Sequence, residues 1–189
     1  MEYLSQISDF VFAVVAVFSS LVAYRGLGDW YRQLETQKKF EVAVNLLEVT
    51  NLLVSRIDAA RNRYVEDIEI SSTQKEYESY VNEFNNRYAP IWKALASFEY
   101  NMIKAEILLG SSFKNNKEEV MECIHTLRQN VRSYLKDMEP EQEHKNTKKG
   151  LEEPRRIVFN FGEDDSFGDE LNKPSSSIKE DLKKIIKYK

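Results

Sequence analysis

The longest apolar run of the chain lies near its N-terminus. Residues 10–24 carry no charge, and the run extends back to Leu4 with Asp9 as the only charged residue. As a helix, residues 4–24 match the roughly 30 Å hydrocarbon core of a bilayer. Apolar residues occur at every angular position, whereas a helix of a soluble domain keeps a polar face. The run predicts an N-terminal transmembrane helix, and residues 1–28 are expected to be a membrane anchor.

Two alternatives to the anchor are a helix buried in a protein and a cleaved signal peptide. A signal peptide has a positive N-terminal region and a small-residue cleavage site, but this chain has no Lys or Arg before Arg25. Basic residues follow the run at Arg25, Arg32, Lys38 and Lys39. The positive-inside rule therefore predicts a single-pass protein of the cell inner membrane, with its N-terminus outside and its C-terminus cytoplasmic.

Steps of three and four between apolar residues predict three long helices in residues 29–139. The first is expected to begin with Asp29 as its N-cap and to end near Val65. It follows the anchor across an expected hinge at Gly26 and Gly28. The second is capped by Ser72 or Thr73, ends at Gly110 and contains Pro90, which should kink it. The third covers about 116–138. We expect a mainly α protein with an antiparallel three-helix bundle or coiled coil.

The composition changes after Pro140. Residues 140–154 are charged and rich in helix breakers, which indicates a linker. Residues 155–189 are expected to hold a short strand-like run, "RRIVFNFG", and a basic amphipathic helix capped within Ser175–Ser177. That helix packs either on the bundle or on the inner leaflet of the membrane. Either this C-terminal segment or a second copy of the chain should cover the part of the second helix that the shorter third helix leaves exposed.

Charge and cysteine content exclude several classes of protein. The 189 residues carry a net charge of −4, which argues against a nucleic-acid partner. The single cysteine, Cys123, cannot form an internal disulfide, which suits a reducing compartment.

The sequence offers little catalytic chemistry. Glu122 and His125 form one Glu-x-x-His unit, but a di-iron bundle needs two such units, and the other histidine, His144, lies in the linker. No nucleotide-binding or hydrolase motif is present. Cys123 is expected to be a packing residue. We therefore predict no catalytic, cofactor-binding or metal-binding residues, no cofactor and no small-molecule substrate.

Three segments together resemble a known group of proteins: "WYRQLETQKKFEVAVNLLEVTNLLVSRIDAARN", "WKALASFEYNMIKAEILLG" and "IVFNFGEDDSFGDEL". The arrangement is similar to an uncharacterised family of small bacterial membrane-anchored proteins with one transmembrane helix and a helical cytoplasmic domain. The resemblance implies this architecture and no activity. The residues that carry it are Trp30, Arg32, Leu34, Ala43, Leu46, Leu47, Ile57, Ala60, Arg61, Trp92, Ala105, Glu106 and Gly110.

These patterns favour a protein that is not an enzyme. We expect it to contact the lipid bilayer through residues 4–24 and to act through protein–protein interaction as a scaffold, adaptor or accessory subunit, with a protein partner or as a homo-oligomer. The alternative is a small membrane effector, such as a defence or toxin component, whose anchor oligomerises and perturbs the bilayer.

Overall fold

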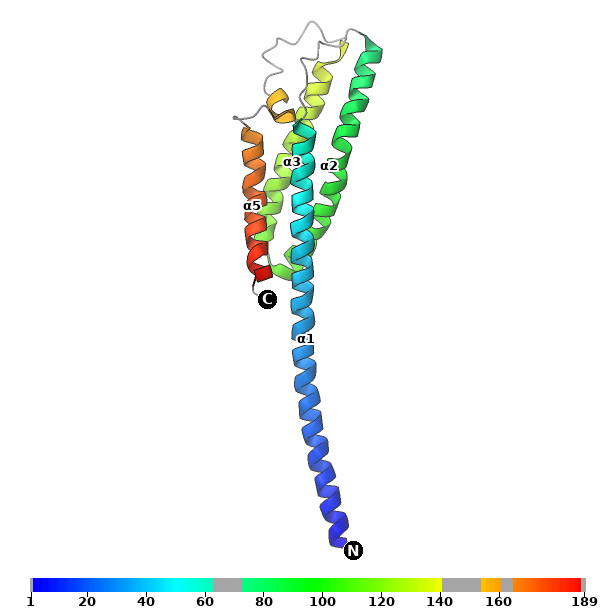
Figure 1. Cartoon of the computed structure of the whole chain (residues 1–189), viewed down its shortest axis with the longest axis vertical. Helices are drawn as coiled ribbons and strands as arrows, with labels where there is room; N and C mark the ends of the chain where they lie inside the picture. Colours follow the sequence, from blue (N-terminus) through cyan, green and yellow to red (C-terminus); the bar gives the residue numbers. More distant parts are fainter. Residues whose placement is uncertain (1, 63–72, 141–153, 161–164, 188–189) are drawn as a thin grey trace. The chain divides into compact units, whose positions relative to one another are not determined.

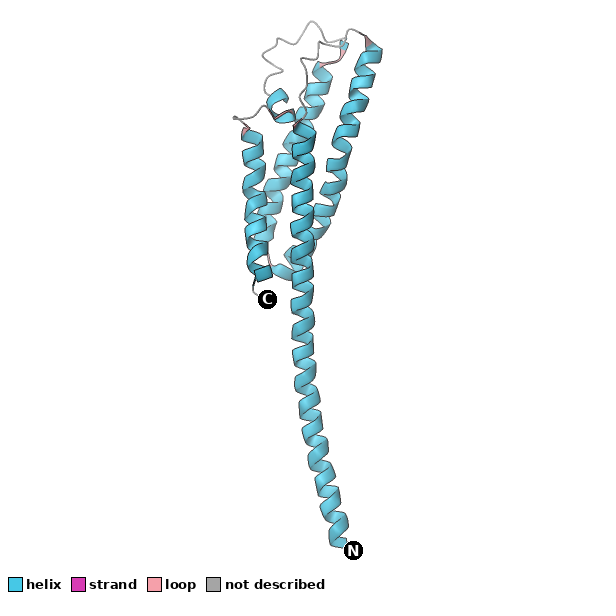
Figure 2. Cartoon of the chain, in the orientation of Figure 1, coloured by secondary structure: helices cyan, strands magenta, loops and turns pink. Residues whose placement is uncertain are grey.

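The computed structural model describes residues 2–62, 73–140, 154–160 and 165–187, without the side chains of residues 2–10 and 13. These residues form α1 (Glu2–Arg61), α2 (Gln74–Leu109), α3 (Ser112–Asp137) and α5 (Ser166–Lys187) (Figure 1). The expectation of a mainly α protein is confirmed, because the described ranges hold helices and no strand (Figure 2).

Contacts divide the chain into two compact units, Met1–Glu41 and Val42–Lys189. The first contains the N-terminal part of α1, and its described side chains from Val11 to Arg32 are all exposed. Helix α1 runs without a break through Gly26, Gly28 and Asp29, so the expected hinge and the N-cap at Asp29 were wrong. A Cβ added at either glycine would meet no atom outside the helix's own backbone within 4 Å, so α1 needs no glycine there.

Within the described residues, no helix combines the length and the apolar character that crossing a bilayer requires.

The second unit is built around a hydrophobic core to which α1, α2, α3 and α5 all contribute. Helix α2 packs on α3, and α3 packs on α5 (Figure 1). The residues of this core with no measurable exposure are Ala43, Leu46, Ile57, Ile91, Phe98, Met102, Ala105, Leu127, Val158, Ile178 and Leu182.

Both predicted ends of α2 are confirmed. The Thr73 hydroxyl accepts a hydrogen bond from the Glu76 N–H, and the Glu76 carboxylate accepts one from the Thr73 N–H, which forms a capping box. Gly110 ends the helix with φ at +118°, a conformation that favours glycine, and donates its N–H to Ala105 O at 3.2 Å. Pro90 lies inside α2, which continues past it.

The C-terminal segment differs from the prediction. Residues 154–158 form a helical turn, so the strand-like run was wrong there. Pro154 can occupy the first position of a helix because no intrahelical bond needs its N–H. Helix α5 begins at Ser166 rather than near Ser175 and continues through Pro174. Residues 141–153, most of the predicted linker, lie outside the described residues.

The same segment folds back on the helices. Val158 and Phe159 belong to the hydrophobic core, and Phe159 contacts the rings of Phe84 and Tyr134. This contact agrees with the predicted fold-back of the C-terminal segment, and cover by a second copy of the chain stays a prediction. Helix α5 packs on α3 with Leu171, Ile178 and Leu182 buried.

Candidate functional site

Three of the residues that the sequence singled out for chemistry, Glu122, Cys123 and His125, lie close together on α3. Glu122 and His125 are exposed on α3, where His125 Nε2 lies 2.6 Å from Gln129 Nε2. Burial raises the pKa of the Cys123 thiol, which disfavours the reactive thiolate. Across the described ranges, no group of three or more His, Cys, Asp or Glu side chains could hold a metal ion. His144 is outside these ranges.

A buried arginine joins the end of α1 to the C-terminal segment. Arg61 is only 1% exposed. Its guanidinium donates to both carboxylate oxygens of Asp165, with Nη1–Oδ2 at 2.9 Å and Nη2–Oδ1 at 2.5 Å. Its Nε donates to the Ile157 carbonyl at 2.8 Å, and its carbon Cζ lies 4.5 Å from the centre of the Phe167 ring. A buried arginine needs such partners, because an unpaired charge in the core is costly.

The carboxylate of Asp165 also caps α5. Its Oδ1 accepts a hydrogen bond from the Gly168 N–H at 3.0 Å. Burial raises the pKa of Asp165, but the hydrogen bonds from Arg61 and Gly168 outweigh burial, and the pKa lies below its usual value. A Cβ on Gly168 would overlap the Oδ2 atom of Asp165. The ion pair and the start of α5 therefore depend on each other.

An aromatic cluster holds the helical turn at 154–158. Phe84 stacks on Tyr88 with ring centres 5.6 Å apart and meets Phe159 edge to face at 5.8 Å. The Tyr88 hydroxyl donates to the Val158 carbonyl at 2.9 Å. Burial raises the pKa of Tyr88 to about 12, so the phenol keeps its proton and remains a donor. These contacts hold the helical turn against α2.

A groove with a volume of about 380 Å³ opens between α1 and α2 within the second unit. Two of its lining residues are the exposed cations Arg56 and Lys93, and none is acidic. We call this the α1/α2 groove. Its lining residues are Leu52, Arg56, Asn86, Ala89, Pro90, Lys93, Ala94 and Ser97.

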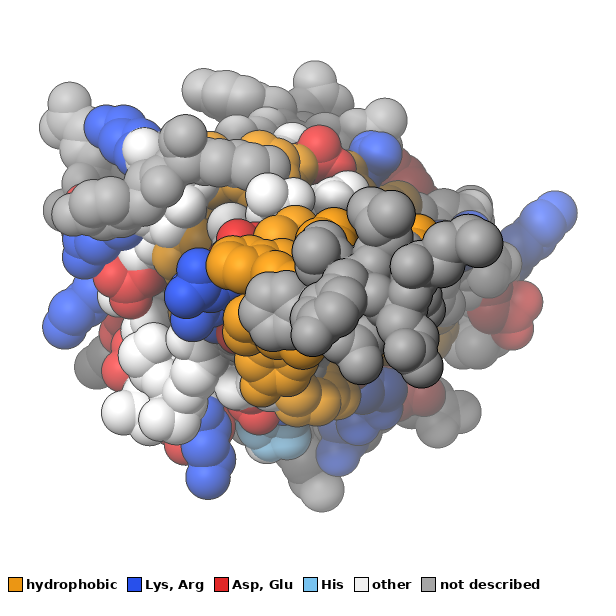
Figure 3. Space-filling view, turned by 90° about the horizontal axis from the view of Figure 1, so that it is seen from below, with side chains coloured by type: hydrophobic (Ala, Val, Ile, Leu, Met, Phe, Trp, Pro, Cys, Tyr) orange, Lys and Arg blue, Asp and Glu red, His pale blue; other side chains and the backbone are white. Residues whose placement is uncertain are grey.

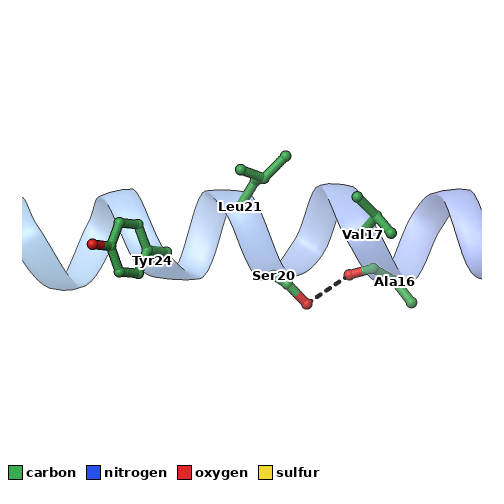
Figure 4. A pocket seen from close by; sticks show the side chains of 5 residues that line it. All are labelled: Ala16, Val17, Ser20, Leu21 and Tyr24. Carbon is green, nitrogen blue, oxygen red and sulfur yellow. Dashed lines mark hydrogen bonds between the residues drawn. The ribbon is translucent and has the colours of Figure 1, made fainter.

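The other candidate site is the apolar surface of the first unit. Val17 and Leu21 line a shallow notch with Ala16, Ser20 and Tyr24 (Figure 4), where the Ser20 hydroxyl donates to the Ala16 carbonyl at 2.8 Å. Figure 3, seen from below, shows hydrophobic side chains gathered near the centre of the view. The large hydrophobic residues of this unit that are exposed are Val11, Phe12, Val14, Val15, Val17, Phe18, Leu21, Val22, Tyr24, Leu27, Trp30 and Tyr31.

Comparisons with protein-family models, with curated proteins and with solved structures gave no significant match to this chain.

Arg61 was singled out in the sequence only through the resemblance, and the roles of Asp165, Gly168 and the α1/α2 groove were not predicted. One signal could have found the arginine. Arg61 follows Ile57 by four residues, on the stripe of α1 that faces the core. An arginine at such a position predicts a buried partner for its charge, although the sequence does not say which carboxylate.

Proposed function

We propose that this protein is a membrane-anchored adaptor, which contacts lipid through residues 4–24 and acts through protein–protein interaction of its helical body. In this proposal it is not an enzyme. The body is an antiparallel bundle of three long helices, to which the C-terminal segment adds α5. The protein is proposed to lie in the cell inner membrane as a single-pass protein, with its N-terminus outside and its body in the cytoplasm.

The observation that carries the proposal is the exposed apolar surface of α1 in the first unit. Phe12, Phe18 and Val22 are 71%, 65% and 69% exposed. Moving one large apolar side chain out of water contributes about 1.5–3 kcal/mol. The exposed residues from Val11 to Val22 together would gain on the order of 10 kcal/mol from a cover.

The distribution of these side chains favours lipid as that cover. Val11, Phe12 and Val14 point in different directions around the helix axis, as do Val15 and Val17. A helix that lies on a membrane surface keeps a strongly polar face, and this part of α1 has none among its described side chains. A helix that is apolar on all sides suits the bilayer interior or the middle of a protein.

Vesicle flotation tests the lipid contact. We expect the full chain to float with phospholipid vesicles in a density gradient. The variant V15K/F18E, which keeps the net charge, should stay at the bottom, because buried charges are costly in hydrocarbon. The matched control Q33K/Q37E changes two exposed polar positions of the same helix and should float. A full chain that stays at the bottom, or a V15K/F18E variant that floats like the control, would refute the anchor.

Labelling of intact cells tests the orientation, and the vesicle preparation tests the alternative function. A cysteine placed at Glu2 in a Cys123→Ser background should react with a membrane-impermeant maleimide added outside intact cells. The notch at Ala16 and Ser20 favours close helix–helix contact, which is what an oligomerising membrane effector would need. Release of a trapped dye from the vesicles would favour that effector over the adaptor.

A further inference from the structure

We propose that the α1/α2 groove binds an acidic amphipathic helix of a protein partner. This inference rests on the proposed function, since it names the surface and the partner chemistry through which the helical body would act.

The charge of the groove is opposite to that of the whole chain. The protein has a net charge of −4, whereas the groove lining has Arg56 from α1, Lys93 from α2 and no carboxylate. In the described part of the chain, neither cation takes part in an ion pair. Carboxylates of a partner would therefore find two available cations beside apolar surface.

The floor of the groove offers apolar contact and a hydrogen-bond acceptor. Leu52 is 44% exposed beside Ala89 and Pro90. Proline has no N–H, so Pro90 cannot donate the α-helical hydrogen bond to the carbonyl oxygen of Asn86, which also lines the groove. This oxygen therefore lacks the intrahelical donor that any residue other than proline would supply at position 90.

The face of α2 that lines the groove continues toward the end of the helix. After Lys93 and Ser97, steps of three and four lead to Tyr100, Lys104 and Ile107. Tyr100 and Ile107 are 60% and 76% exposed, and Lys104 Nζ lies 4.2 Å from the centre of the Tyr100 ring. From Asn86 to Ile107 this face is about 30 Å long, a length that suits a partner helix rather than a small molecule.

Charge also decides between a different protein and a second copy of this chain. In a two-fold symmetric dimer the same surface meets itself. Arg56, Lys93 and Lys104 would then approach the same cations of the other copy, and like charges brought together at an interface are unfavourable. An acidic partner avoids this repulsion.

Fluorescence anisotropy with a designed peptide tests the proposal on the full chain in detergent. The probe is a labelled peptide of about five helical turns, with leucines at helical spacing flanked by glutamates, and its counterpart has lysine in place of each glutamate. We expect the wild type to bind the glutamate peptide at least about tenfold more tightly than the lysine peptide, as close charge pairs at an interface allow. The variant R56E/K93E should lose this preference and bind the lysine peptide more tightly than the wild type does.

The control variant R132E/K136E makes the same change in net charge on exposed positions of α3 and should bind like the wild type. Equal binding of the two peptides by the wild type would overturn the proposal, as would equal binding by R56E/K93E and the control. If instead R132E/K136E alone weakens binding, the groove is wrong while a protein-binding function stands. If R56E/K93E binds both peptides as the wild type does, but floats less well than the wild type with anionic phospholipid vesicles, the groove contacts lipid and the proposal fails.

Discussion

The guanidinium of Arg61 and the carboxylate of Asp165, 104 positions apart in the chain, meet through two hydrogen bonds in the core of the second unit. Arg61 ends α1 and Asp165 precedes α5. Because the apolar N-terminal run belongs to the same helix as Arg61, this pair connects the helix of the proposed anchor to the C-terminal segment.

Replacing Arg61 should therefore be strongly destabilising. In Arg61→Met, the Asp165 carboxylate loses its counter-charge and keeps only the Gly168 N–H as a donor, while the Ile157 carbonyl loses the Arg61 donor in a mostly buried setting. Removing one partner of a buried pair costs about 3–5 kcal/mol. Urea unfolding followed by circular dichroism measures this loss, and the control Arg132→Met, at an exposed site of α3, should change stability by less than about 0.5 kcal/mol. Similar stability of the two variants would contradict a role for the pair.

Substituting Gly168 tests the same junction without removing a charge. A Cβ at Gly168 would overlap the Oδ2 atom of Asp165, so Gly168→Ala must displace the carboxylate from Arg61. Overpacking of this kind costs about 1–3 kcal/mol. The control Gly28→Ala meets no neighbouring atom within 4 Å and should leave stability unchanged or slightly higher. Thermal unfolding of both variants gives the comparison, and equal melting temperatures would show that Asp165 can move freely.

The ion pair of Arg61 and Asp165 should also make the free energy of unfolding depend on pH. Because the folded-state pKa of Asp165 is lowered, the stabilisation is present above its unfolded pKa of about 3.9 and is lost as the pH falls through the folded pKa. Asp165→Asn should thus be less stable than the wild type at neutral pH, and the difference should shrink in acid. Urea midpoints measured from about pH 3 to about pH 7 follow it. A difference that stays constant over this range would contradict the shift.

Asp58 provides a contrast of opposite sign. Burial raises its pKa, with Arg61 opposing and the Asp165 carboxylate adding to the increase. The contribution of protonated Asp58 to folding stability is present below about pH 3.9 and is lost as the pH rises through the folded-state pKa of this residue. Asp58→Asn should therefore be more stable than the wild type at neutral pH, with the gain vanishing in acid in the same urea series. Lower stability at neutral pH would mean that the charge of Asp58 is used by a partner.

Local sequence signals predicted the parts of the fold that depend on local chemistry. Thr73 and Glu76 lie three residues apart and form the capping box that such spacing allows, and Gly110 has the positive φ expected after a helix. The steps of three and four between apolar residues that predicted this helix also mark its buried side at the centre of α2, where Phe84, Tyr88 and Phe98 are buried.

The C-terminal segment could not be predicted in this way, because contacts distant in sequence decide it. Ile157 and Val158 are β-branched and favour a strand locally, but the described residues offer no partner strand, and Val158 is buried in the helical core instead. The last helix was predicted to begin within Ser175–Ser177, after both Gly168 and Pro174. The bonds from Arg61 and Gly168 to Asp165 fix the start of α5 before both residues.

Removing the Tyr88 hydroxyl should have a smaller effect than breaking the ion pair. In Tyr88→Phe the ring remains in its stack, but the Val158 carbonyl loses a donor at 2.9 Å. A buried acceptor left without its partner costs about 1–3 kcal/mol. The exposed Tyr100→Phe is the matched control and should be neutral by thermal unfolding. Equal melting temperatures for both variants would mean that another donor replaces the hydroxyl.

Phe159 of the C-terminal segment covers the aromatic cluster of α2, and its removal should expose that cluster. Phe159 is 2% exposed and packs on Phe84 and Tyr134. Phe159→Ala should lower stability by about 3–5 kcal/mol through the cavity it leaves. It should also speed cleavage of the C-terminal segment by a protease, because the segment loses its ring contacts with Phe84 and Tyr134.

Light scattering of the full chain in detergent measures the mass of the protein particle. This mass reports whether the aromatic cluster of α2 is covered, independently of the loss of stability. Exposed apolar surface favours association, so Phe159→Ala should have a larger mass than the wild type at micromolar concentration. Ile107→Ala, on the exposed face of α2, is the control that leaves the cluster covered and should match the wild type. A Phe159→Ala variant with the mass of the wild type and an equally protected C-terminal segment would show that this segment holds its place through Arg61 and α5 alone.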